Sequence, residues 1–491
     1  MRPRRPSPIA ALSESQAGMT ETLIAPRWLW IAIFLGVYSA LLALLHPIYV
    51  LLAVTPLLLV CVAWWTLIGA PDRWLTIFLC AAILLPPLPI ALGDSGPHPC
   101  LVIAALGALA GLIRLTDWRI PTGALSRSIL MLFFVLLFSS ALAALYSGVP
   151  VALGTVARVM LFGISVYIFF YTTSGPSAQG QTRTFRAARV LFLAGTASAA
   201  FACIDFYFQF PAPAGFGPQY VWLDSGVYRR AQGLFYEAST LGNFCAFFLV
   251  MVAVALMRPK KDFPIARPVL LAGAAVFSAA LVLSFSRASL LNILVAITAL
   301  LWLHRDRFRF RKPGLVFVLA VAAGSALTYY LLPAFTQLYL DRLSASATYL
   351  FSSTEGVLSG RLSSWSALAG FLRENPAYAL LGIGYKTLPY SNFIGQAVVG
   401  DNMYLTMLVE TGVIGLAALL VLNAAILRAA YRAARDASPQ ASFFGTWIFC
   451  FWMGQMFQML SGDLLTYWRV LPFYFWALAV AVRATNEHSV S

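Results

Sequence analysis

Residues 269–303 read VLLAGAAVFSAALVLSFSRASLLNILVAITALLWL, an apolar run interrupted by one charge, Arg287. Basic segments flank the run on both sides, RPKKDFPIAR at 258–267 and HRDRFRFRK at 304–312. A single helix of about 35 residues would be roughly 52 Å long, whereas the hydrocarbon core of a bilayer is about 30 Å thick. It would also place one basic flank on each side of the membrane. We therefore predict two short antiparallel spans that meet at 284–287, with the turn recessed below the outer surface.

The rest of the chain repeats this apolar pattern. Of its 491 residues, 60% are apolar and only 10% are charged, which excludes a water-soluble globular protein. The six cysteines stand singly, so they form neither a disulfide framework nor a metal-ligand pattern. The composition predicts an all-α polytopic membrane protein, a bundle of about 12–14 transmembrane helices with one large outer loop that contains amphipathic helices.

We count fourteen candidate spans, with twelve as the alternative count. They cover residues 28–45, 48–69, 74–92, 100–113, 129–146, 151–171, 190–210, 237–257, 269–285, 288–303, 315–333, 403–427, 443–460 and 469–482. The N-terminus lacks the short apolar core of a signal peptide, so we do not expect cleavage there. The predicted parts are a disordered cytoplasmic N-terminus at 1–27, a transmembrane bundle at 28–333, a large outer loop at 334–402, and C-terminal spans with a short cytoplasmic tail at 403–491.

Basic residues set the orientation of these spans. With a cytoplasmic N-terminus, 24 of the 33 Lys and Arg residues fall in cytoplasmic segments. This is the positive-inside pattern, and it places both termini in the cytoplasm. The net charge of +15 is spread over separate short loops, so topology explains it better than nucleic-acid binding does.

Nine basic residues break this rule, because they map to the outer face or to the outer half of a span. They are Arg158, Arg229, Arg230, Arg287, Arg342, Arg361, Arg373, Lys386 and Arg469. Arginine presents a planar fork of donors that matches two phosphate oxygens, so a recessed cavity lined by arginines suits a diphosphate. Ser286 would cap the helix that starts at Arg287, and that helix N-terminus would attract an anion.

The arginines of this predicted site have alternative roles. Arg158 lies roughly 12 Å down its helix from Pro150, and its alternative is snorkelling toward the outer headgroups. Arg229 and Arg230 precede a span, and their alternative is a solvated pair in a loop. For Arg287 the alternative is a buried ion pair that holds the two short helices together.

The outer loop contains SGRLSSWSALAGFLRENP at 359–376, which predicts an amphipathic helix capped by Ser359 and stopped by Pro376. Its apolar face is predicted to contain Leu362, Trp365, Leu368, Ala369 and Leu372. Arg361, near the start of the helix, is a further candidate phosphate ligand. Trp365 is a candidate contact for the acceptor, with packing onto the bundle as the alternative.

Two carboxylates are candidate general bases. Asp401 opens the span DNMYLTMLVETGVIGL at 401–416, where it would orient or deprotonate a hydroxyl, with helix capping as the alternative. Its neighbours Asn402 and Tyr404 are candidate acceptor contacts. Glu237, at the outer start of another span, is the rival base. Glu410 falls on the opposite helix face from Asp401, and we predict that it pairs within the bundle.

Four motifs in order carry a resemblance to a known family: RRAQGLFYEASTLGN at 229–243, LSFSRASLL at 283–291, SGRLSSWSALAGFLRENPAYALLGIGY at 359–385 and DNMYLTMLVETGVIGL at 401–416. Over about 225–425 the chain resembles the O-antigen ligase/polymerase family of bacterial envelope glycosyltransferases. Members use a glycan carried on a polyprenyl diphosphate, which ligases pass to lipid A–core and polymerases pass to the next repeat unit. The resemblance implies that outer arginines, here Arg229 or Arg230 and Arg287, grip the diphosphate, and that Arg361 belongs to the loop motif.

Ligases of this family typically have His-Asn where this chain has Asp401-Asn402, which looks more like the polymerase branch. The resemblance therefore implies polymerisation of lipid-linked repeat units into exopolysaccharide or O-antigen at the periplasmic face of the bacterial inner membrane. The alternatives are an O-antigen ligase and a lipid-linked oligosaccharide flippase. We expect an inverting transferase without metal or cofactor. The expected partners are the polyprenyl-diphosphate-linked donor, a glycan or lipid A–core acceptor, the bilayer, a chain-length regulator and a flippase, and no nucleic acid.

Overall fold

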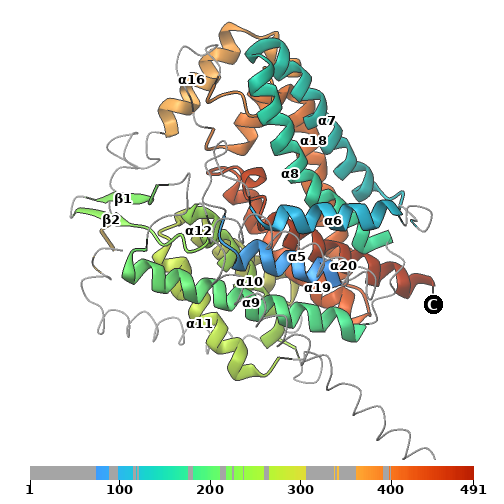
Figure 1. Cartoon of the computed structure of the whole chain (residues 1–491). Helices are drawn as coiled ribbons and strands as arrows, with labels where there is room; N and C mark the ends of the chain where they lie inside the picture. The colour runs from blue at the N-terminus through green and yellow to red at the C-terminus, as the bar shows by residue number, and fades with distance from the viewer. Residues whose placement is uncertain are drawn as a thin grey trace, which may run out of the picture. The chain divides into compact units, whose positions relative to one another are not determined.

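The apolar runs of the sequence form helices that pack into a bundle in the computed structural model (Figure 1). The structure describes residues 73–87, 98–113, 118, 121–174, 181–210, 217–223, 226–235, 237–258, 265–305, 337, 340–341, 361–390, 398 and 400–490. All of them belong to one unit of the chain, 71–491. The predicted spans at 28–45, 48–69 and 315–333 lie outside the described residues.

Every other predicted span coincides with a helix. The helices are α5 (Arg73–Leu84), α6 (Cys100–Ile113), α7 (Ala124–Ser147), α8 (Val149–Ser174), α9 (Gln181–Phe208), α10 (Ala238–Leu256), α11 (Arg267–Leu283), α12 (Arg287–Leu303), α16 (Arg361–Glu374), α17 (Tyr378–Leu381), α18 (Met403–Ala434), α19 (Pro439–Gln458), the short 3₁₀ helix η5 (Leu464–Thr466) and α20 (Leu471–Val490). Among the described residues, five helices are long and apolar enough to cross a membrane, namely α7, α8, α9, α10 and α18. The chain is an all-α polytopic membrane protein, as predicted.

The run at 269–303 folds as two helices, α11 and α12, that meet at 284–286 as predicted, and each of them packs against α10. Phe285, in the turn between them, has a φ of 51°, the left-handed conformation. Ser286 is the N-cap of α12, and its hydroxyl accepts a hydrogen bond from the Ser289 amide at 3.4 Å. Arg287 is therefore the first residue of a capped helix, as the sequence predicted.

Loops that the charge pattern assigns to the same side contact one another. At one end of the bundle, the Ala231 amide donates to the Leu283 carbonyl at 2.9 Å and so joins two segments predicted to lie outside. At the other end, the Arg258 guanidinium donates to the Pro439 carbonyl at 3.0 Å and joins two segments predicted to lie in the cytoplasm. These contacts agree with the alternation of sides read from the basic residues.

The core lies around α10, which packs against α9, α11, α12 and α19. Phe247 of α10 packs against Trp447 of α19, with ring centroids 4.3 Å apart, and against Tyr474 of α20, with centroids 4.6 Å apart. Beside these rings, four buried side-chain amides bond across α10, α12 and α19: Asn243, Asn292, Gln455 and Gln458. Interhelical hydrogen bonds of this kind are worth roughly 0.6 kcal/mol each on average in a membrane protein.

A short hairpin, β1 (Tyr220–Leu223) and β2 (Gly226–Arg229), follows α9 in a segment expected to be an irregular loop. The strands are antiparallel, and Tyr220 pairs with Arg229. Aromatic and β-branched residues alternate in both strands, which favours extended backbone. The hairpin places Arg229 at the end of β2 and Arg230 directly beyond it.

α16 confirms the amphipathic helix predicted in the outer loop. Leu368 and Phe371 are buried in a hydrophobic cluster with residues that include Ile383. Ala369 is exposed, so its predicted place on the apolar face was wrong. The reason is that the buried face is centred between 368 and 371, three residues apart, and position 369 is rotated away from that line. The predicted cap, Ser359, lies outside the described residues.

Candidate functional site

α18 is interrupted at Gly412, where φ is 68° and ψ is −172°. The segment 382–388 packs against α18 just before this interruption, because the Gly384 amide donates to the Glu410 carbonyl at 2.9 Å. Helix carbonyls near a break lack their usual partners within the helix, and the Gly384 amide is such a partner for the Glu410 carbonyl. The glycine-punctuated segment of the predicted outer loop is thus part of the bundle, and it presents Lys386 there.

Lys386 forms an ion pair with Asp463. Asp463 is the N-cap of η5, where its Oδ1 accepts a hydrogen bond from the Leu465 amide at 2.9 Å. Burial alone would lower the pKa of Lys386, but the carboxylates of Asp463 and Glu410 outweigh burial and raise it. The ammonium group therefore stays charged even though its side chain is only 15% exposed.

Glu237 is the N-cap residue of α10, and its carboxylate accepts a hydrogen bond from the Ser239 hydroxyl at 3.0 Å. Burial raises the pKa of Glu237 above the usual range of a glutamate. The Ser239 hydroxyl, Lys386 and Arg230 act in the opposite direction, whereas Asp463 raises the pKa further. Glu237, Arg230, Lys386 and Asp463 therefore share one electrostatic neighbourhood, which we call the charged cluster.

Arg230 and Arg287 meet at the turn between α11 and α12. The Arg230 Nε donates to the Ser284 carbonyl at 2.8 Å, at the C-terminal end of α11. A cation there is favoured by the partial negative charge of a helix C-terminus. Arg287 begins the next helix three residues later and is partly buried. The structure thus brings two of the predicted diphosphate ligands to the same turn.

Arg229, the sequence neighbour of Arg230, has different partners. Its guanidinium pairs with Asp205 of α9 at 3.3 Å and donates to the Phe210 carbonyl at 2.7 Å. Both side chains of the ion pair are less than one tenth exposed. Arg229 therefore joins the hairpin to the end of α9, while Arg230 contacts the C-terminal end of α11 and acts electrostatically on Glu237. The resemblance left these two arginines as alternative diphosphate ligands, and the structure gives them different partners.

Arg158, in the outer part of α8, contacts the segment that carries Lys386. Its Nη2 donates to the Tyr390 hydroxyl at 3.4 Å, and its guanidinium lies 5.8 Å from the centre of the Tyr390 ring. Arg158 also acts electrostatically on Lys386. These contacts hold Arg158 at the segment 382–390 of the protein, which is a more specific arrangement than snorkelling to headgroups.

Asp401 and Asn402, at the N-terminus of α18, differ in their position relative to the helix. Asn402 is the N-cap, because its Oδ1 accepts hydrogen bonds from the amides of Tyr404 at 3.0 Å and Leu405 at 3.2 Å. Capping, the alternative considered for Asp401, is thus performed by Asn402. The Tyr404 hydroxyl donates to the Met456 carbonyl at 3.0 Å and so ties α18 to α19. Asp401 precedes the cap and is partly buried.

Two predicted site residues, Arg361 and Trp365, belong to the outer-loop helix α16. Arg361 is the first residue of α16, and its side chain lies outside the described residues. Trp365, one turn later, is partly buried, and its indole Nε1 is shielded from solvent and has no hydrogen-bond partner among the residues that the structure describes. An indole N–H in that state is a donor that a bound ligand would satisfy.

Residues 272–420 match the sequence model of a family described as O-Antigen ligase. Over this segment the chain is similar to the O-antigen ligase family. The matched segment begins within α11, ends within α18, and includes Arg287, Lys386 and Asp401. A comparison with curated proteins gave no match. The match supports a relation of this membrane protein to the O-antigen ligase/polymerase family.

Asp463 is the residue of the charged cluster that the sequence did not reveal, and it lies beyond the segment that matches the O-antigen ligase family. Glu410, predicted to pair within the bundle, does so: its Oε1 accepts a hydrogen bond from the Leu388 amide at 3.3 Å. The other oxygen, Oε2, is buried and has no hydrogen-bond partner within the described part of the chain. Arg469, one of the nine outer basic residues, instead joins its own loop to the C-terminal end of α5 and to the loop before α10, by donating to carbonyls that include that of Ala82 at 2.7 Å.

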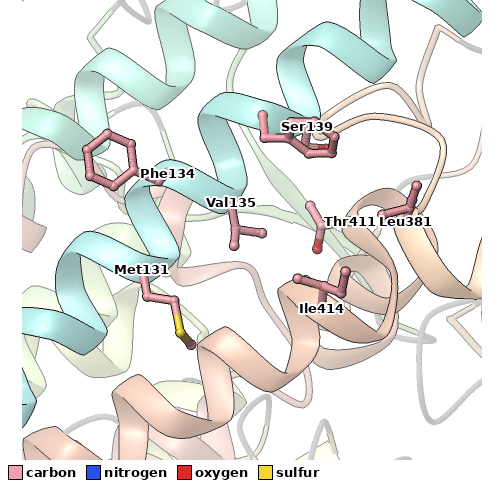
Figure 2. A pocket seen from close by; sticks show the side chains of 8 residues that line it. Met131, Phe134, Val135, Ser139, Leu381, Thr411 and Ile414 are labelled. Carbon is pink, nitrogen blue, oxygen red and sulfur yellow. The ribbon is translucent and has the colours of Figure 1, made fainter.

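An apolar pocket of about 280 Å³ lies between α7, α17 and the break in α18 (Figure 2). It is lined by Met131, Phe134, Val135, Phe138, Ser139, Leu381, Thr411 and Ile414. Phe138 and Ile414 are exposed, as expected for a wall that faces lipid. Ser139 connects the pocket to the site, because its hydroxyl accepts a hydrogen bond from the Tyr385 amide at 2.8 Å, next to Lys386.

Proposed function

We propose that this protein polymerises polyprenyl-diphosphate-linked oligosaccharide repeat units into exopolysaccharide or O-antigen at the periplasmic face of the inner membrane. One observation carries the proposal: the Glu237 carboxylate shares the charged cluster with two cations, Arg230 and Lys386. A diphosphate leaves readily once its charge is neutralised, and a sugar hydroxyl attacks readily once a base accepts its proton. The charged cluster contains both kinds of group.

In the proposed reaction, the acceptor hydroxyl oxygen bonds to the anomeric carbon of the donor as the bond from that carbon to the diphosphate oxygen breaks. The hydroxyl proton passes to Glu237, with Asp401 as the second candidate base. Polyprenyl diphosphate leaves as an anion that Arg230, Arg287 and Arg158 neutralise. Direct displacement of this kind inverts the anomeric configuration.

The choice of polymerase over ligase rests on Asp401, since ligases that resemble this chain have histidine there. O-antigen ligation to lipid A–core is the alternative function. A lipid-linked oligosaccharide flippase is the second alternative, but it would need charged groups along a path through both leaflets, whereas the charged cluster lies at one end of the bundle. A flippase that delivers the donor and a chain-length regulator are proposed partners.

Chain-length analysis of the product made from purified lipid diphosphate donor tests this function. Wild-type protein should lengthen repeat units in a membrane free of lipid A–core. Glu237→Gln keeps the size of the side chain but removes its charge, so turnover should fall by roughly 10²–10⁴-fold while donor binding is retained. Arg258→Met is the matched control, because the contacts of Arg258 lie at the opposite end of the bundle.

Each alternative predicts a different result in this assay. Strict dependence on lipid A–core, with one transfer and no lengthening, would identify a ligase. Donor movement across vesicles without transfer would identify a flippase. If Glu237→Gln is fully active and Asp401→Asn is inactive, Asp401 is the base.

A further inference from the structure

Lys386 has a backbone conformation that is unfavourable for any residue with a side chain. Its φ is 59°, in the left-handed region where residues other than glycine are uncommon. Conformations of this kind persist only where the surroundings enforce them, and they concentrate at ligand-binding and active sites. Phe285, directly before the cap of α12, shares the feature with a φ of 51°. Both positions adjoin the candidate site.

The bundle enforces this conformation through Tyr385, the residue before Lys386. The Tyr385 amide donates to the Ser139 hydroxyl of α7 at 2.8 Å, and the Tyr385 carbonyl accepts a hydrogen bond from the Thr155 hydroxyl of α8 at 2.8 Å. On the other side of Lys386, Thr387 is fully buried. The Lys386 backbone is therefore fixed between two transmembrane helices, and its side chain leaves the segment in a defined direction.

The ion pair of Lys386 with Asp463 is not explained by stability alone. Both side chains are largely buried, at 15% and 7% exposed, and the removal of two charges from water is costly. Apolar residues of similar volume often replace buried ion pairs without loss of stability. An ammonium group has three N–H donors, and Asp463 takes one of them. A role in ligand binding would account for a charge held at this position.

Lys386 also links two groups of cations. It lies within electrostatic reach of Arg158 on α8 and of Glu237 at the start of α10. Arg230 acts on the same Glu237 carboxylate. Lys386 thus connects Arg158 to the charged cluster. Cations from α8, the segment 382–388 and the end of β2 form one neighbourhood that suits an anion with two linked phosphates.

We propose that Lys386 is a ligand of the diphosphate group and that Asp463 is a positioning residue that holds the Lys386 ammonium in place. The identity of the natural ligand rests on the proposed function. Binding at Lys386 itself requires only an anion made of two linked phosphates. The compact ammonium charge of Lys386 complements the planar guanidinium forks of Arg158, Arg230 and Arg287.

A charge exchange in the full-length protein separates ligand binding from a purely structural ion pair. The double variant Lys386→Asp with Asp463→Lys restores an ion pair but moves the cation to η5. If Lys386 binds phosphate, the thermal stability of the double variant should approach that of wild type, while its affinity for inorganic pyrophosphate, measured by calorimetry, should be at least about 10-fold weaker. Affinity equal to that of wild type and of Arg258→Met would overturn the proposal.

A second measurement needs no variant. The chain has four lysines, and the other three, Lys260, Lys261 and Lys312, lie in predicted cytoplasmic loops and serve as internal controls. Inorganic pyrophosphate should slow acylation of the Lys386 amine several-fold, as read by mass spectrometry, relative to chloride at equal ionic strength. Equal rates in the two salts would overturn the proposal. Protection of Lys386 in a protein that forms no polymer would support this inference and reject the proposed function, and polymer formation without protection would do the reverse.

Discussion

Glu237 shows how its surroundings change the pKa of an ordinary carboxyl group. A glutamate has a usual pKa of about 4.5, and burial at the start of α10 raises it. Lys386 and Arg230 keep the increase from being larger. A carboxyl group with a raised pKa is a stronger base once it is ionised, because proton transfer to it is more favourable.

The sign of this shift predicts the pH dependence of the reaction. Glu237 accepts a proton only when it is ionised, so kcat/KM should fall with decreasing pH along an acid limb above pH 4.5. Glu237→Gln should abolish the limb. Lys386→Met removes a cation that lowers the pKa of Glu237, so it should move the limb to higher pH. A pH profile measured with purified donor checks both changes, and a limb that persists in Glu237→Gln would assign the base to another group.

The sequence revealed cations of the site but not their partners. Arg158 and Arg287 were predicted because a charge inside an apolar run is costly and therefore conspicuous. Asp463 follows a span, where a carboxylate looks like any loop residue. Its partner Lys386 is 77 positions away along the chain, and local sequence pattern carries no information on such a pairing. For the same reason, the sequence could not tell that Arg229 would pair with Asp205 while Arg230 faces the charged cluster.

At the scale of elements, helices were predictable and their interruptions were not. The sequence predicted one continuous span at 403–427, and α18 extends from Met403 to Ala434 with a non-helical residue at Gly412. Glycine inside an apolar run is compatible with either structure, because it costs only about 1 kcal/mol in a helix. The left-handed conformation arises from packing, since the Leu380 carbonyl lies where a side chain at 412 would point.

Two glycine substitutions measure how much this interruption matters. Gly412→Ala should destabilise the protein by more than about 1–2 kcal/mol, because alanine is disfavoured at positive φ and its methyl group would overlap Leu380. Gly370→Ala, within α16, has open space around the added methyl group and should be neutral or stabilising by about 0.5–1 kcal/mol. Thermal unfolding of both variants in the same detergent gives the comparison. Equal stability of the two would mean that the backbone at 412 relaxes easily into a regular helix.

At the scale of the whole molecule, charge and length were sufficient to predict the architecture. The run at 269–303 is too long for one span and has basic flanks on both sides, and these two facts predicted the division into two helices that α11 and α12 show. The hairpin β1–β2 was missed, because four-residue strands between helices have too little periodicity to be recognised. The contacts between loops agree with the predicted alternation of sides. They would be the same whichever end of the bundle faced the periplasm.

The basic residues predict that the charged cluster is periplasmic, and two matched positions test it. Ala377, between α16 and α17, and Ala437, between α18 and α19, are both exposed and are predicted to lie on opposite sides. In a variant without the six native cysteines, Ala377→Cys should react with an impermeant thiol reagent in intact spheroplasts, whereas Ala437→Cys should react only after lysis. Since both are alanine-to-cysteine changes at exposed sites, a difference in labelling reports the side of the membrane. The reverse pattern would place Lys386, Asp463 and Glu237 in the cytoplasm, where a periplasmic polymerase could not use them.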